Sequence, residues 1–146
     1  HKPNYQNGVA GAVPGRINQN RNRQEGERRP SGSSSGGVII AVDFDGVLSS
    51  AGKWPEVGEP NEALMNWLSD LRTGGHKVIL WTCRVGEALE SAVAQCREHG
   101  LEFDAVNDNI PEIVEMYGVN SRKITADYYI DDKAVVVKFE KGKEHE

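Results

Sequence analysis

Residues 38–48 read Val-Ile-Ile-Ala-Val-Asp-Phe-Asp-Gly-Val-Leu, and this stretch decides the fold. Its first five residues are apolar and mostly β-branched, which predicts a strand buried on both faces of a parallel sheet. Asp43 and Asp45 follow at the carboxyl end of the strand, where such sheets carry their chemistry. Two crowded carboxylates repel each other, so a bound cation or a functional proton would explain the pair. The alternative is a strand that stops at a polar Asp-Gly turn.

The remaining apolar patterns predict alternating helices and strands. Helical spacing predicts one helix from Pro60 to the Gly-Gly pair at 74–75 and a second that ends near Gly100. Four further strands are expected at residues 77–82, 103–106, 126–130 and 134–139, and a short helix at 111–116. Repeated strand-helix-strand units with right-handed crossovers predict an α/β fold, namely a Rossmann-like three-layer arrangement around a mostly parallel five-stranded sheet.

The composition divides the chain at about position 37. Residues 1–37 are rich in Gly, Asn, Gln, Arg and Ser, carry six Lys or Arg against two Glu, and end in a Gly/Ser linker. They predict a disordered basic tail, which is either a solvated segment or an arm that contacts nucleic acid or a protein partner. Residues 38–146, with 11 basic against 20 acidic side chains, form the predicted folded domain. Their acidic balance argues against broad nucleic-acid binding and suits a site for a divalent cation.

The cysteines and the hydropathy bear on localisation. Cys83 and Cys96 are the two cysteines of the chain, and their spacing suits neither a metal site nor a disulfide scaffold. This usage favours the reducing cytoplasm. No apolar run is long enough to span a membrane, and the N-terminus lacks the apolar core of a signal peptide, so we expect no membrane association.

Six polar side chains fall at or near the ends of the predicted strands. They are Asp43, Asp45, Thr82, Lys123, Asp131 and Asp132. Because parallel strands place their carboxyl ends along one edge of the sheet, we expect these residues to meet there. In such a set one carboxylate can attack phosphorus to form an aspartyl-phosphate, while a second moves the proton. Carboxylates and a backbone carbonyl suit Mg²⁺, a hydroxyl with turn N–H groups can hold phosphoryl oxygens, and a lysine offsets the negative charge.

Four short motifs carry a resemblance to the haloacid dehalogenase-like (HAD) superfamily. Asp-Phe-Asp-Gly-Val-Leu at 43–48 resembles its first motif, and Ile-Leu-Trp-Thr at 79–82 resembles its second. Lys123 resembles the lysine of the third motif, and Ile-Asp-Asp at 130–132 resembles the acidic fourth motif. The resemblance spans residues 38–139 and implies a HAD-like fold.

The resemblance also implies roles for these residues. Asp43 would be the nucleophile, Asp45 the general acid/base and Lys123 the charge stabiliser. The implied phosphate-binding residues are Thr82, Cys83 and Arg84, and the implied Mg²⁺ ligands are Asp43, Asp45, Asp131 and Asp132. The presence of an acid at position 45 favours a phosphatase over a dehalogenase.

Several of these assignments have alternatives. Arg122 competes with Lys123 for the role of the site base, because Lys123 precedes Asp131 by only eight positions. Either Asp131 or Asp132 could be the direct metal ligand. Arg84 could cap the following helix or pair with a nearby glutamate instead of binding phosphate.

The intervals between the motifs are too short for a large cap domain, so the chain resembles the small capless HAD phosphatases. An open site of this kind suits a large phosphorylated substrate, unless a neighbouring subunit or the loop at Lys53-Trp54 acts as a lid.

The expected function is therefore enzymatic: a cytoplasmic, Mg²⁺-dependent phosphomonoester hydrolase that acts on a phosphorylated substrate through an aspartyl-phosphate. Two alternatives remain. One is a non-catalytic HAD-like module that binds phosphate or a partner. The other is a phosphatase that processes nucleic-acid ends and uses the basic tail.

Overall fold

The computed structural model describes residues 37–140 of the chain. They form an α/β fold in which four parallel strands make one sheet, in the order β3-β2-β1-β4. The strands are β1 (Ile39–Val42), β2 (Lys77–Leu80), β3 (Ala105–Val106) and β4 (Tyr128–Ile130). The helices are α3 (Glu62–Thr73), α4 (Gly86–Glu98) and α5 (Pro111–Tyr117). The predicted basic tail lies, except for Gly37, outside the described residues.

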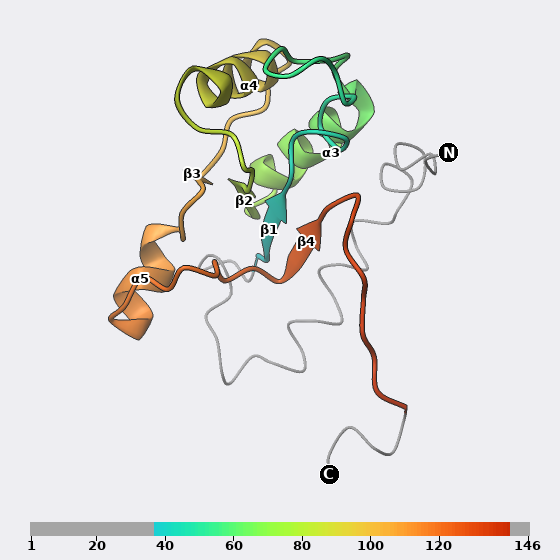
Figure 1. The fold of residues 1–146 in the computed structure, drawn as a ribbon. Helices are drawn as coiled ribbons and strands as arrows, with labels where there is room; N and C mark the ends of the chain where they lie inside the picture. The colour runs from blue at the N-terminus through green and yellow to red at the C-terminus, as the bar shows by residue number, and fades with distance from the viewer. Residues whose placement is uncertain (1–36, 141–146) are drawn as a thin grey trace.

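Helices cover both faces of the sheet, with α3 and α4 on one side and α5 on the other (Figure 1). Alternate residues of β1 point to opposite faces, as the pleat of a strand requires. Ile40 packs in one cluster with Leu68 of α3, and Ile39 packs in a second cluster with Ile113 of α5. All four residues of β1 are buried, which confirms the predicted burial of this strand on both faces. Each large apolar side chain buried in this way contributes about 1.5–3 kcal/mol.

The helix expected to begin at Pro60 begins at Glu62 instead, because Asn61 caps it. The Asn61 Oδ1 accepts a hydrogen bond from the Leu64 N–H at 3.2 Å, and its Nδ2 donates to the Val47 carbonyl at 3.0 Å. Asn61 is 4% exposed, so its side chain links the segment after β1 to the start of α3. Pro60 lies just before this cap and forms a bridge with Ser49. Among residues 37–140, no helix combines the length and the apolar character needed to cross a membrane.

The expectation of a fifth strand at 134–139 is wrong, and the sheet has four strands. Residues 134–139 have no regular secondary structure, and Val135, Val137 and Phe139 are between 72% and 87% exposed. Their β-branched composition fits a strand, but β-propensity acts only where a neighbouring strand and a buried face are available. After Asp132 the chain instead leaves the sheet at β4, one of its two edge strands (Figure 1).

Candidate functional site

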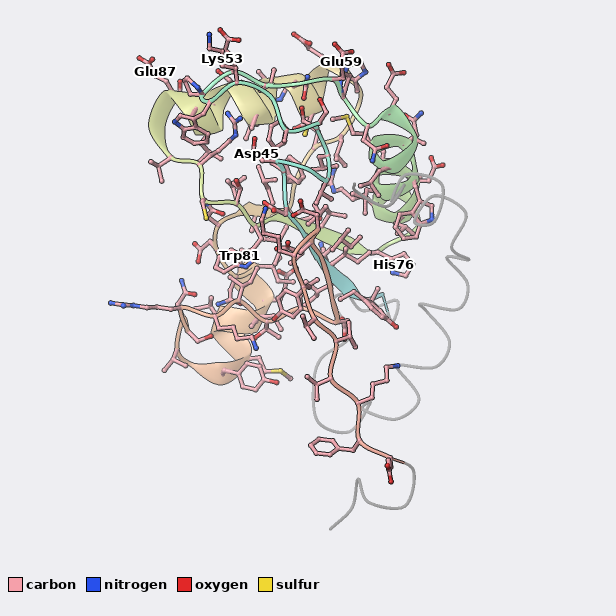
Figure 2. The ribbon with its side chains drawn as sticks, turned by 45° about the vertical axis from the view of Figure 1, so that its right-hand side comes forward. Asp45, Lys53, Glu59, His76, Trp81 and Glu87 are labelled. Atoms are coloured by element: carbon pink, nitrogen blue, oxygen red, sulfur yellow. The ribbon has the colours of Figure 1, made fainter. Side chains whose placement is uncertain are left out.

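The register of the sheet places four predicted strand ends in one row. The last fully paired row consists of Val106, Leu80, Val42 and Ile130. The residues that follow them are Asn107, Trp81, Asp43 and Asp131. In Figure 2, Trp81 and His76 mark opposite ends of β2, and Asp45 lies toward the end that Trp81 marks. The carboxyl edge of the sheet therefore carries the candidate site, as predicted for parallel strands.

Asp43, Asp131 and Asp132 form a cluster at this edge, which we call the carboxylate cluster. One carboxylate oxygen from each residue lies within 4.8 Å of the others. Asp43 is held in place because its N–H donates to the Ile130 carbonyl at 2.9 Å and its Oδ1 accepts from the Phe44 N–H at 2.7 Å. The side chain of Asp132 is only 2% exposed, although its backbone is more accessible. The structure thus brings together three of the four predicted metal ligands.

Burial and like charges act together on Asp43. The pKa of this carboxyl is raised from 3.8 to about 6. Desolvation by burial is the largest cause and the nearby carboxylates of Asp131, Asp132 and Asp45 add to it, whereas the hydrogen bond from the Phe44 N–H lowers the pKa. A cation between the carboxylates would remove this repulsion. Three converging carboxylates are the hard oxygen donors that Mg²⁺ takes, and they leave room for the waters that it keeps. The carboxylate cluster therefore fits Mg²⁺ by its donor chemistry.

Asp45, the fourth predicted ligand, is engaged elsewhere. Its two carboxylate oxygens accept from the Arg84 guanidinium, with Nε–Oδ2 and Nη2–Oδ1 distances of 2.9 and 2.8 Å. Arg84 is 1% exposed, and its carbon Cζ lies 4.9 Å from the ring centres of both Phe44 and Trp54. The structure thus places Asp45 opposite Arg84 rather than in the carboxylate cluster.

Arg84 also fastens the loop that precedes α3. Its Nη1 donates to the carbonyls of Pro55 and Ala88 at 2.8 and 3.0 Å, and its Nη2 donates to the Glu56 carbonyl at 3.1 Å. Together with Asp45, these acceptors use all five N–H donors of the guanidinium. Direct phosphate binding by the Arg84 side chain stays a prediction, and it would need some of these bonds to open.

Residues 50–59, which we call the covering loop, are tied down at their base. The Ser50 N–H donates to the Glu59 carbonyl at 2.8 Å, and Gln95 of α4 donates to the Gly58 carbonyl at 2.9 Å. Lys53 and Glu59 of this loop and Glu87 of α4 lie along the same outer side of the molecule in Figure 2. The covering loop is therefore bonded to Arg84 through the Pro55 and Glu56 carbonyls and to α4 through Gln95.

Thr82 lies in a short loop that Asn107 organises. The Thr82 N–H donates to Asn107 Oδ1 at 2.8 Å, and Thr82 Oγ1 accepts from the Arg84 N–H at 3.2 Å. Asn107 has a φ of 53°, in the left-handed region where asparagine is among the tolerated residues. From its position after the third strand, Asn107 is predicted to form a turn, with a role in the site as the alternative; the sequence does not indicate that it supports Thr82. Cys83, which lies between Thr82 and Arg84 in the chain, is exposed and carries a free thiol.

The cations at the site differ from the expectation. The Lys123 ammonium lies 5.8 Å from the centre of the Tyr129 ring, and within residues 37–140 it makes no ion pair with the carboxylate cluster. Lys133, which sequence reasoning did not single out, places its Nζ 3.7 Å from Asp132 Oδ2. The signal that could have found it is its position directly after the two acidic residues. The roles predicted for Lys123 and Arg122 stay predictions.

Comparisons with known proteins give one informative match. No family model matches the sequence, and no curated protein matches it. A solved structure of a conserved protein coded by a locus from Bacteroides thetaiotaomicron matches with a TM-score of 0.59 and 42% sequence identity. The match covers 68% of this chain and 78% of that chain. An identity this high over most of the other chain shows common ancestry as well as a common fold.

Proposed function

The chain belongs to the same family as the conserved Bacteroides thetaiotaomicron protein, and we propose that it is a Mg²⁺-dependent phosphomonoester hydrolase of the HAD type. The observation that supports this most is the carboxylate cluster at the carboxyl end of the central strand. Asp43, Asp131 and Asp132 converge there, with Asp45 two residues after Asp43. Clusters of carboxylates at this position have few structural uses, because their mutual repulsion destabilises the fold.

The arrangement of the motifs supports the finer proposal of a Rossmann-like, HAD-like fold. Asp43 follows β1, Thr82 follows β2 and Asp131 follows β4, so three of the four motifs come together at one edge of the sheet. A cap domain could be inserted between β1 and α3, but this interval holds only the short covering loop. We propose that the capless arrangement leaves the edge open to a substrate from outside.

In the proposed first step an Asp43 carboxylate oxygen attacks phosphorus. An oxygen–phosphorus bond forms at Asp43, and the bond from phosphorus to the leaving oxygen breaks. Asp45 gives a proton to the leaving oxygen, which departs as an alcohol. Asp45 then takes a proton from a water molecule that attacks phosphorus, and Asp43 is released with inorganic phosphate. The sum is the hydrolysis of one phosphomonoester by one water.

The remaining site residues would neutralise the charge of the phosphoryl group and orient it. Mg²⁺ bound by Asp43, Asp131 and Asp132 would neutralise the phosphoryl oxygens and keep Asp43 ionised at neutral pH. The Thr82 hydroxyl can donate to a phosphoryl oxygen while its lone pair keeps the Arg84 N–H. Lys123 and Lys133 are the candidates for charge stabilisation; Lys133 is already beside Asp132, whereas Lys123 must leave Tyr129.

The test of this proposal is phosphate release from a generic aryl phosphate by the full chain. Asp43→Asn removes the nucleophile but keeps the volume, so turnover should fall at least about a thousandfold. Asp70→Asn, the same change on the exposed side of α3, is the matched control and should keep wild-type turnover. EDTA should abolish the activity and added Mg²⁺ should restore it. Wild-type turnover by Asp43→Asn would refute the mechanism.

One observation favours a second candidate, a non-catalytic module that binds phosphate. Asp45 is tied to Arg84 by both oxygens, and an acid held in this way has to be released before it can move protons. A protein that binds Mg²⁺ and a phosphate-mimicking fluoride but never releases phosphate would fit this alternative. The end-processing alternative depends on residues 1–37, and comparing the full chain with a chain lacking them, on a phosphorylated oligonucleotide, would test it.

A further inference from the structure

A polar hollow lies at the carboxyl edge of the sheet, on the β2 and β3 side of Asp43. It has a volume of about 270 Å³, and its lining includes Trp81, Asn107, Asp108, Asn120, Ser121 and Arg122. Trp81 directly follows β2 and Asn107 directly follows β3, just as Asp43 directly follows β1, and the last paired residues of these strands are Leu80, Val106 and Val42. Adjacent strands are about 4.8 Å apart. Trp81, which lines this hollow, is therefore about one strand spacing from Asp43, within reach of a group bonded to a phosphorus atom at Asp43. We call this cavity the Trp81 hollow.

The wall of the Trp81 hollow is preformed. Asn109, which is 4% exposed, donates from Nδ2 to Asn120 Oδ1 at 2.9 Å and to the Ser121 carbonyl at 3.1 Å. Asn120 in turn donates from Nδ2 to Asp108 Oδ1 at 2.9 Å. The Thr125 N–H donates to Asn109 Oδ1 at 2.7 Å, which fixes the far end of the same loop. These bonds hold the side chains of Asn120 and Asp108 in place before a ligand arrives.

The wall still has hydrogen-bonding capacity. Asn120 has a second N–H on Nδ2 and a second lone pair on Oδ1, and Asp108 has its Oδ2. Arg122 has no ion-pair partner within residues 37–140. Trp81 is half-buried: it packs on the cluster that contains Ile113 and also lines the hollow, between the end of β2 and α5 (Figure 2). An aromatic ring thus lies beside amide, carboxylate and guanidinium groups.

We propose that the Trp81 hollow binds the nucleoside part of a nucleoside phosphate. A nucleobase has a flat face that stacks on an aromatic ring and an edge that pairs with amides and carboxylates, and this lining offers both. The hollow on the other side of Asp43 is lined mainly by apolar residues such as Val47, Leu64 and Val136, so it suits a different ligand. A volume of about 270 Å³ is slightly below the usual range for small-molecule sites, so the hollow has room for one nucleoside at most.

This inference rests on the proposed function and names its substrate class. Asp43 attacks the phosphorus of the nucleoside phosphate, and the bond from phosphorus to the ribose or deoxyribose oxygen breaks. The nucleoside leaves with the proton from Asp45, and water completes the release of inorganic phosphate. The nucleoside phosphate could be a free mononucleotide or the terminal nucleotide of an oligonucleotide, and the two share the chemistry that the Trp81 hollow recognises.

The first experiment measures kcat/KM of the full chain for a nucleoside 5′-monophosphate, for a phosphorylated trinucleotide and for glycerol phosphate. Asn120→Ala and Trp81→Leu should each lower the ratio of kcat/KM for the nucleotide to that for glycerol phosphate about tenfold, mainly through KM. Asn66→Ala, an exposed asparagine of α3, is the matched control and should leave the ratio unchanged. A higher kcat/KM for the mononucleotide would identify a free nucleotide as the substrate, and a higher kcat/KM for the trinucleotide would identify the end of an oligonucleotide. An unchanged ratio in both site variants would overturn the proposal.

A second experiment separates this inference from the proposed function. Asp43→Asn protein is titrated with the unphosphorylated nucleoside, and binding is followed by calorimetry. Saturable binding that Asn120→Ala weakens supports the Trp81 hollow even if the wild type releases no phosphate, in which case only the proposed function fails. Hydrolysis of glycerol phosphate without any nucleoside binding overturns the inference and leaves the proposed function standing.

Discussion

Arg84 and Asp45 form a bidentate ion pair in which the guanidinium is 1% exposed and the carboxylate side chain is 36% exposed. The pair joins residues that are 39 positions apart and spans from the end of β1 to the start of α4. The same guanidinium binds two carbonyls of the covering loop. Arg84 therefore links the proposed proton carrier to the loop above it, and movement of that loop would change how Asp45 is held.

Arg84→Ala should destabilise the protein strongly. The change leaves Asp45 without its cation and leaves the Pro55, Glu56 and Ala88 carbonyls without a donor. Breaking a buried pair by removing one partner costs about 3–5 kcal/mol, and the partial exposure of Asp45 places the expected loss near the lower end, at about 3 kcal/mol. Urea unfolding followed by circular dichroism measures it.

Arg97→Ala is the control for this measurement. Arg97 pairs with Glu102 at 3.4 Å, and both side chains are more than half exposed. Exposed pairs contribute about 0–1 kcal/mol, so this variant should unfold close to the wild type. Equal effects of Arg84→Ala and Arg97→Ala would show that Arg84 does not fasten the covering loop.

Asp43→Asn should stabilise the metal-free protein at neutral pH. The folded state raises the pKa of Asp43 from 3.8 to about 6, so it binds this proton more tightly than the unfolded state does. The ionised carboxylate therefore destabilises the fold above pH 6, and this penalty fades as the pH falls toward 4. This rise in the pKa of Asp43 corresponds to a loss of at most about 3 kcal/mol in the free energy of unfolding. Because the carboxylate is half-exposed, solvent screening reduces the expected loss to about 1–2 kcal/mol.

The measurement is urea unfolding in EDTA at pH 8, 6 and 4. The stability advantage of Asp43→Asn should be largest at pH 8 and should vanish near pH 4. Asp70→Asn, on the exposed side of α3, should show no such trend. An advantage that grows as the pH falls would contradict the direction of the pKa shift.

The sequence predicted the features that depend on local pattern. β1 was recognised because its apolar residues are consecutive, and Asp43 and Asp131 meet because parallel register aligns the strand ends. The features that were missed depend on partners distant in the chain. Nothing near Arg84 indicates Asp45 as its partner, and residues 134–139 have strand composition without a neighbouring strand. Asn107 is 25 positions from Thr82, so the sequence predicts a turn or a site role there but not the bond to the Thr82 N–H.

Asp132→Asn should weaken Mg²⁺ binding more than any change outside the carboxylate cluster. Its side chain is 2% exposed and contributes one of the three converging oxygens, so the amide removes both a charge and a strong ligand. We expect an affinity loss of about tenfold or more. Calorimetric titration with MgCl₂, or the rise in Tm at increasing MgCl₂, measures it. Asp70→Asn is again the control, and unchanged affinity in Asp132→Asn would remove this residue from the ligand set.

Asn107 offers a test of how the Thr82 loop is supported, because three substitutions separate two contributions. Asn107→Asp keeps an acceptor for the Thr82 N–H and a residue that tolerates the φ of 53°, and it loses only the long Nδ2 bond to the Arg84 carbonyl at 3.4 Å. Asn107→Gly keeps the backbone freedom but loses the acceptor, at a cost of about 1 kcal/mol. Asn107→Ala loses the acceptor and adds strain of about 1–2 kcal/mol.

The expected order of unfolding free energy is therefore the wild type, closely followed by Asn107→Asp, then Asn107→Gly, then Asn107→Ala. Urea unfolding at pH 8 ranks the four proteins, and Asn66→Ala on α3 serves as an exposed control within about 0.5 kcal/mol of the wild type. If Thr82 binds the phosphoryl group, KM for an aryl phosphate should rise in the Gly and Ala variants, since both release the Thr82 N–H. An Ala variant as stable as the Gly variant would show that the left-handed backbone at Asn107 relaxes, and that the hydrogen bond alone supports the loop.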